Sequence, residues 1–147
     1  MDIVQSAPFV RPARPARLSA RAGVVVSALP VLFLIFDGAI KFSHIAPVSE
    51  AFAHLGIPEG LASGIGLLQL VCVAAYVWPR SAVLGALLLT GFLGGAICLH
   101  VRVGDPLFSH VLFPVYVGAL LWGGLLLREP RLRALLPLRG QEPVTKS

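Results

Sequence analysis

The residues best suited to chemistry are a few polar side chains set within or beside long apolar stretches. Asp37 and Lys41 are four residues apart, so they share one face of a helix in the favourable acid-before-base order, and His44 continues that face. Ionisable groups inside a membrane are costly and point to function by default. With the polar side chains farther along, the candidate ligand-binding set is Asp37, Lys41, His44, Gln69, His100, His110 and Tyr116.

These residue types suit proton transfer, quinone binding or metal binding, since imidazoles beside carboxylates serve all three. The histidines and most acids are expected on one side of the membrane, as a polar mouth from which Asp37, Lys41 and Gln69 lead inward. No HxxxH or ExxH motif is present, so no metal is expected. No residue is assigned a catalytic role, and the pattern leaves open whether the chain is an enzyme.

Each candidate also has a structural interpretation. Lys41 can extend toward the membrane surface, which would make Asp37 and Lys41 a structural pair. His44 lies in a loop, where it would simply be solvated, and His100 and His110 can cap helix ends at the interface. The sequence leaves both interpretations open.

The composition places these residues in a membrane protein. The chain has 147 residues, of which 56% are hydrophobic and 13% charged, whereas about a quarter are charged in a soluble domain. A helix needs about 20 apolar residues to cross about 30 Å of hydrocarbon. We therefore predict an all-α polytopic membrane protein, a four-transmembrane-helix bundle (residues 23–127) with spans at about 23–42, 59–78, 82–101 and 107–127.

The basic residues predict the orientation of the bundle. They gather in residues 1–22, at Arg80 and in residues 128–147, so both termini are expected in the cytoplasm. Residues 1–22 are interpreted as a flexible basic arm and residues 128–147 as a tail. The first apolar stretch is too long for a signal peptide, which predicts an uncleaved span. The net charge of +5 is therefore a topology signal, and no nucleic-acid partner is expected.

The connections and the small residues predict how the helices pack. Val48, Phe52 and Leu55 predict a short helix on the membrane surface, and Ser81 is a candidate cap of the third span. Kinks are expected at Pro30 and Pro114. Small residues favour packing inside one bundle, with self-association as the alternative. The small residues concerned are Gly60 and Gly64, Gly91 and Gly95, Ala86, Thr90 and Gly94, and Gly118, Gly123 and Gly124.

The two cysteines are expected to stay unpaired. By helix rise, Cys72 should lie about 19 Å and Cys98 about 5 Å below the outer surface, and a disulfide needs Cα atoms within about 7 Å. Thiol–disulfide chemistry is therefore disfavoured.

Several short pieces of the chain resemble the DoxX-like family of small bacterial membrane proteins. The pieces are GAIKFSH (38–44), FAHLGIP (52–58), GLLQL (66–70) and GGAICLHV (94–101), and the resemblance runs from about residue 33 to 127. The resemblance implies a four-helix bundle. The family takes its name from a subunit of a thiosulfate:quinone oxidoreductase, but most members have no established activity. Members often carry an acid where this chain has Gln69, so the departure removes a charge from the membrane.

Three functions fit these observations. The favoured one is an accessory or quinone-linked subunit of a membrane redox system in the bacterial inner membrane, with a quinone as the fitting cofactor and none bound covalently. The alternatives are an assembly subunit of a larger complex and a small-solute or proton pathway. The expected partners are the lipid bilayer, other membrane subunits or a second copy. The site is expected to open outward between the ends of the first, third and fourth spans.

Overall fold

The computed structural model describes residues 14–130 and 132, and it contains only helices and their connections over that part of the chain. Four helical segments are long and apolar enough to cross a membrane: Leu18–Ile40, Glu59–Val77, Ala82–Val103 and Leu107–Arg128. The prediction of four spans is confirmed. The helices are α1 (Arg14–Ile40), α2 (Ala46–His54), the 3-10 turn η1 (Glu59–Leu61), α3 (Ala62–Val77), α4 (Ala82–Val103), the π-helical turn η2 (Leu107–Val111) and α5 (Phe113–Arg128).

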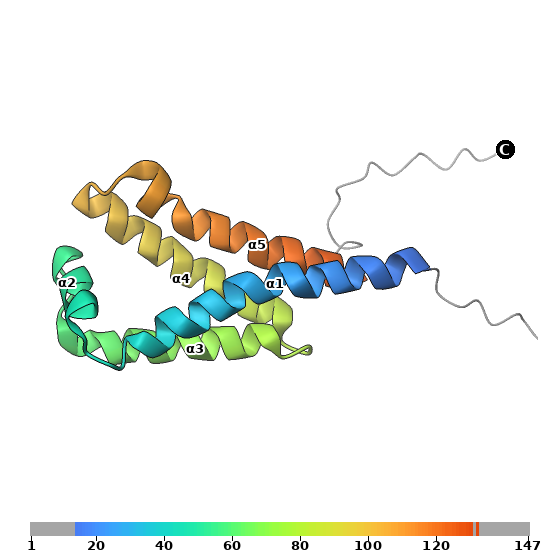
Figure 1. The fold of residues 1–147 in the computed structure, drawn as a ribbon, viewed down its shortest axis with the longest axis horizontal. Helices are drawn as coiled ribbons and strands as arrows, with labels where there is room; N and C mark the ends of the chain where they lie inside the picture. Colours follow the sequence, from blue (N-terminus) through green and yellow to red (C-terminus); the bar gives the residue numbers. More distant parts are fainter. Residues whose placement is uncertain (1–13, 131, 133–147) are drawn as a thin grey trace, which may run out of the picture.

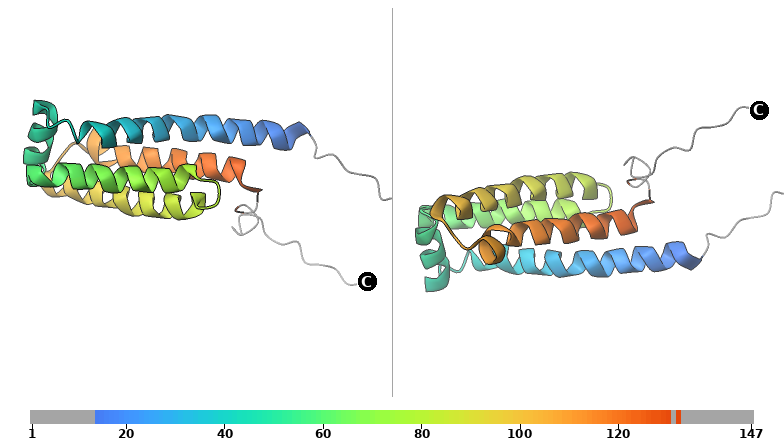
Figure 2. Two further views of the ribbon diagram at one scale, coloured as in Figure 1. Left: turned by 90° about the horizontal axis from the view of Figure 1, so that it is seen from below. Right: turned by 90° about the horizontal axis from the view of Figure 1, so that it is seen from above.

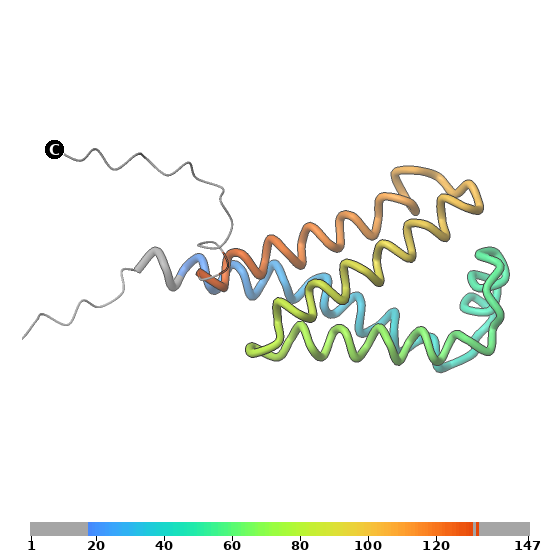
Figure 3. Tube along the Cα trace, turned by 180° about the vertical axis from the view of Figure 1, so that it is seen from behind, coloured from blue at the N-terminus to red at the C-terminus, as the bar shows by residue number. Residues whose placement is uncertain are grey.

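The four long helices form an antiparallel bundle with α2 lying across one end (Figure 1). Around the bundle, α1 packs against α5 and α3, α3 packs against α4, and α4 packs against α5. Figure 2 shows that α1 extends beyond its neighbours at the end opposite α2, and Figure 3 shows the same arrangement from behind. We call the two ends of the bundle the α2 end and the termini end.

The first helix begins earlier than the sequence predicted. It starts at Arg14 rather than at Gly23, so residues 14–22, expected to belong to a flexible arm, are helical. Alanine and arginine are strong helix formers, and Pro15 is compatible with a first helical turn. The rest of the expected arm, residues 1–13, and residues 133–147 of the expected tail lie outside the described residues.

The connections follow the sequence with two corrections. The predicted surface helix is α2, which buries Val48 and Phe52. Ser81 occupies the N-cap position of α4 as predicted, but its side chain makes no capping hydrogen bond, because its hydroxyl donates instead to the Ala75 carbonyl. Pro114 lies in the first turn of α5 rather than inside a continuous helix, since the fourth span begins with the π-helical turn η2. Proline fits a first turn because the amide hydrogen it lacks would have no helical partner there.

A buried tyrosine joins three helices in the half of the bundle nearer the termini. Tyr76 of α3 is fully buried, and its hydroxyl donates to the Leu121 carbonyl of α5 at 2.7 Å. The Ser27 hydroxyl of α1, 2.9 Å away, then donates to the Tyr76 oxygen. Lipid supplies no hydrophobic drive for helix association, so such hydrogen bonds, worth about 0.6–2 kcal/mol each, are a main source of cohesion. This contact was not predicted from the sequence.

The glycines that pack inside the bundle are mostly not those predicted. A Cβ on Gly85 of α4 would lie 2.1 Å from the Tyr76 nitrogen, and one on Gly124 of α5 would lie 2.2 Å from the Ser27 oxygen. A Cβ on Gly66 of α3 would lie 2.7 Å from the Gly38 carbonyl oxygen of α1. By contrast, a Cβ would meet no described atom within 4 Å at six glycines expected to pack internally: Gly60, Gly64, Gly91, Gly94, Gly95 and Gly123. The prediction of internal packing is wrong for these six, because no neighbouring helix approaches them closely enough for contact.

Gly85→Ala is expected to destabilise the bundle by about 1–3 kcal/mol, because the new methyl group overlaps the α3 backbone, which cannot move aside locally. Gly94→Ala on the same helix is the matched control and is expected to be neutral. Thermal unfolding of both variants in one detergent measures the difference. Equal unfolding midpoints for the two variants would show that α3 and α4 do not approach as described.

Candidate functional site: a cavity beneath α2

The predicted polar pair of the first span forms a closed network with the second span. Lys41 forms an ion pair with Asp37 on α1 and also donates to the Asp37 backbone carbonyl at 2.9 Å. Its third contact is the Gln69 side-chain oxygen of α3, at 3.2 Å. An ammonium group has three hydrogens, so the described residues satisfy all the donors of Lys41.

Gln69 is the fully buried centre of this network. Its amide nitrogen lies 2.9 Å from the Leu34 carbonyl and 2.9 Å from an Asp37 carboxylate oxygen. Gln69 thus bridges α1 and α3 with both its donor and its acceptor. A neutral amide serves here because it accepts from Lys41 and donates to Asp37 at once, which a carboxylate in its place could not do.

A second polar cluster lies at the α2 end, centred on Asp105 in the turn after α4. One Asp105 oxygen is 2.6 Å from His100 Nδ1 of α4, and the other is 2.7 Å from His54 Nε2 of α2. The His110 ring stands edge-on to His100, with ring centroids 5.7 Å apart. Arg102 also donates to the Leu55 carbonyl at the end of α2. The end of α4 therefore anchors the C-terminal end of α2 by two separate contacts.

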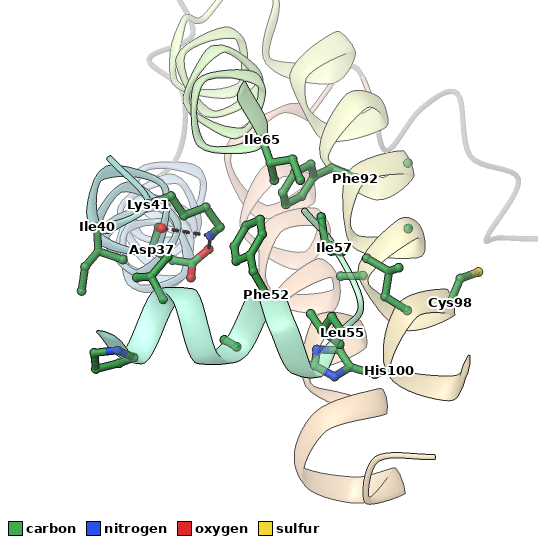
Figure 4. Close-up of a pocket in the computed structure, with 17 residues that line it drawn as sticks. Asp37, Ile40, Lys41, Phe52, Leu55, Ile57, Ile65, Phe92, Cys98 and His100 are labelled. Atoms are coloured by element: carbon green, nitrogen blue, oxygen red, sulfur yellow. Dashed lines mark hydrogen bonds and ion pairs between the residues drawn. The ribbon is translucent and has the colours of Figure 1, made fainter. Parts of the chain in front are cut away.

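A cavity of about 780 Å³ separates these two clusters. Asp37 and Lys41 lie on one side of it and His100 on another, with Phe52 of α2 projecting between them (Figure 4). The remaining lining side chains are apolar apart from the thiol of Cys98. Such a cavity, largely apolar with a few polar groups, has the usual character and size of a small-molecule site, about 300–1,000 Å³.

The structure brings together only part of the predicted candidate set. Asp37, Lys41 and His100 line the cavity, and Gln69 lies directly behind the first two. His44 is elsewhere, with Nε2 3.3 Å from the Ser63 hydroxyl. His110 and Tyr116 do not line the cavity.

The expectation that the site lies between the ends of the first, third and fourth spans is therefore corrected. The lining residues come from α1, α2, α3, α4 and the α2–η1 connection, and none comes from α5. The α2 helix covers the centre of the bundle end, while η2 displaces the start of the fourth span. That α2 lines the cavity, above all through Phe52, was not predicted. The apolar spacing of Val48, Phe52 and Leu55 could have indicated it, because it shows that one face of this helix is buried.

Metal ligation finds no support in this cluster. Among the residues that the structure describes, no group of three or more histidine, cysteine, aspartate or glutamate side chains is arranged to hold a metal ion. The two thiols are also far from forming a pair, since Cys72 is buried and Cys98 exposed, and both are free.

Lys41→Met is expected to destabilise the protein by up to about 3 kcal/mol, because it leaves the Asp37 carboxylate without its cation. This expected loss is at the low end of the range for breaking a buried ion pair, because the Asp37 side chain is 39% exposed. The double variant Asp37→Asn, Lys41→Met removes both charges and is expected to recover part of the loss. Unfolding in detergent compares the two, and a double variant no more stable than the single one would contradict the charge argument.

The Asp105 cluster predicts a loss of stability in acid. Hydrogen bonds from His100 and His54 hold the pKa of Asp105 below its ordinary value of 3.8. The Asp105 carboxyl then binds a proton less tightly in the folded protein than in the unfolded chain. The stability that the Asp105 carboxylate contributes is therefore complete above pH 3.8 and is lost as the pH falls through the lowered pKa. The difference in unfolding midpoint between the wild type and Asp105→Asn should shrink below that pH. A difference that stays constant into stronger acid would refute the assignment.

Comparison with known proteins assigns this chain to a family. The family model described as the DoxX-like family matches residues 25–124, a range that includes both polar clusters and every residue lining the cavity. No curated protein and no solved structure gives a significant match. Because the family match covers well over half of the chain, this membrane-spanning four-helix protein belongs to the DoxX-like family.

Proposed function

We propose that the chain is a quinone-pool-binding subunit of a bacterial membrane redox system, and that it holds the reduced, quinol form in the cavity beneath α2. The observation that carries the proposal is the cavity itself, which has apolar walls with Asp37 and Lys41 on one side and His100 on another. A planar ring with a polar oxygen at each end fits that distribution. A bound quinol would supply two electrons and two protons to a partner protein.

The preference for the reduced form follows from which polar atoms remain available. Lys41 uses its three hydrogens on Asp37 and Gln69, so it has none left for a quinone carbonyl. The Asp37 carboxylate contacts Lys41 and Gln69 through one oxygen, and the other has no partner among the described residues. That oxygen accepts a hydrogen bond, so it favours a ligand with a hydroxyl group over one with a carbonyl.

His100 supports the same preference. Its Nδ1 atom pairs with Asp105, which orients the ring and leaves Nε2 without a partner among the described residues. When Nδ1 carries the hydrogen toward the carboxylate, Nε2 is an acceptor. The cavity then offers an acceptor from Asp37 and another from His100, and the two hydroxyls of a quinol match them.

The charge distribution supports the orientation proposed with this function. Arg21, Arg80 and Arg128 lie at the termini end, which the positive-inside tendency would place in the cytoplasm. The α2 end, with the cavity and the histidines, would then face the extracytoplasmic side.

A second candidate role is assembly within a larger membrane complex. It is favoured by the glycines that pack against none of the described residues, notably Gly60 and Gly64 of the second span. Small residues on an outward face permit close approach of another helix. This role is compatible with quinol binding. A pathway for protons or solutes gains little support, since buried Leu34, Leu89 and Leu121 fill the centre of the bundle.

Titration of the purified protein in nanodiscs with a short-tailed quinol and the matching quinone tests the proposal. The wild type should bind the quinol more tightly, and Asp37→Asn should weaken that binding about tenfold, since a hydrogen bond to a charged group is worth about 1.5–3 kcal/mol. His100→Ala is the second variant and keeps the Asp37–Lys41 pair intact. Tyr116→Phe, outside the cavity, is the control. Equal binding of both redox forms, or binding unchanged in both site variants, would refute the proposal.

A further inference from the structure

The cavity has an opening on its α4 side. Gly91, Gly95 and Cys98 all line the cavity, yet all three are exposed. They follow one face of α4, and a Cβ on either glycine would meet no described atom within 4 Å. In Figure 4, Cys98 lies at the margin of α4, away from the other lining side chains. Because glycine has no side chain, Gly91 and Gly95 leave a gap in the cavity wall.

This gap lies at the depth of the hydrocarbon. Both glycines belong to the apolar span Ala82–Val103. At 1.5 Å per residue, Gly95 lies roughly 12 Å and Gly91 roughly 18 Å from the end of α4 at Val103. The hydrocarbon core is about 30 Å thick, so the gap extends from its outer part to about its middle. Whatever enters there comes from lipid and not from water.

The α2 helix covers the cavity at the end of the bundle. It packs Val48 and Phe52 inward against Ala62 at the start of α3. Its C-terminal end is attached to the end of α4 through His54 to Asp105, at 2.7 Å, and through Arg102 to the Leu55 carbonyl. A ligand that arrived from water would have to displace this helix, whereas the gap beside Gly91 and Gly95 requires no rearrangement.

We infer that the cavity takes its ligand sideways from the bilayer, through the gap at Gly91 and Gly95, and that the hydrocarbon tail of the quinol stays in this gap. The head group then lies deeper, toward Asp37 and His100. The identity of the head group rests on the proposed function, but the lateral route does not. Leucine at either glycine would fill the space that the tail needs.

Photolabelling in liposomes tests the route with two probes that carry the same photoreactive alkyl tail. One probe has a hydroquinone head and the other a phosphocholine head. The quinol probe is expected to label residues around Gly91, Gly95 and Phe52. Gly91→Leu with Gly95→Leu should reduce this labelling at least fivefold. Gly94→Leu, at a position on the same helix that does not line the cavity, should leave it unchanged.

The outcomes separate the route from the head group. Labelling that is insensitive to the paired leucines, or that rises when Asp105→Asn loosens α2, would overturn the lateral route. Labelling by neither probe at these positions would also overturn it. Labelling by the phosphocholine probe, blocked by the paired leucines and unaffected by added quinol, would support the route and refute the quinol head group.

Discussion

A polar group inside a membrane must find its partners within the protein, and this constraint organises the molecule. Lys41, Asp37 and Gln69 satisfy one another across α1 and α3, with Gln69 completely buried between the helices. An unpaired charge at this depth would cost several kcal/mol. The network therefore fixes how α1 and α3 face each other, and two of its members, Asp37 and Lys41, also line the cavity. The same contacts that stabilise the helix pair thus determine the chemistry of the cavity wall.

The two halves of the bundle differ because the small residues and hydrogen bonds are unevenly placed. Toward the termini, Gly85 and Gly124 let helix backbones meet, and Tyr76 links three helices. At the α2 end no such hydrogen bond joins α4 to α1 among the described residues, and the cavity, covered by α2, lies between these helices. At the α2 end, small residues and shared hydrogen bonds join α1 to α3 through Gly38, Gly66 and Gln69.

Much of this was predictable from sequence because the signals are local or strongly constrained. Span lengths, the surface helix with Val48 and Phe52, and the pairing of Asp37 with Lys41 depend on spacing along one helix. The family resemblance was also correct. Gln69 could be placed at the right depth, although its exact partners could not. Long-range contacts escaped prediction: which glycines pack depends on helix rotation, and the Tyr76 contact joins residues far apart in sequence. For the same reason the sequence did not show that Tyr116, a member of the candidate ligand-binding set, is 47% exposed on α5 and does not line the cavity.

The central claim is that the cavity between α1, α2, α3 and α4 binds a quinol, with Asp37 and His100 at its polar ends. The most direct measurement is an experimental structure of the protein in a lipid nanodisc with a quinol analogue whose ring carries bromine. The account predicts ring density within the cavity, with one hydroxyl within hydrogen-bonding distance of Asp37. Ring density on the outer surface of the bundle, or a cavity filled by its own side chains with the analogue absent, would contradict it.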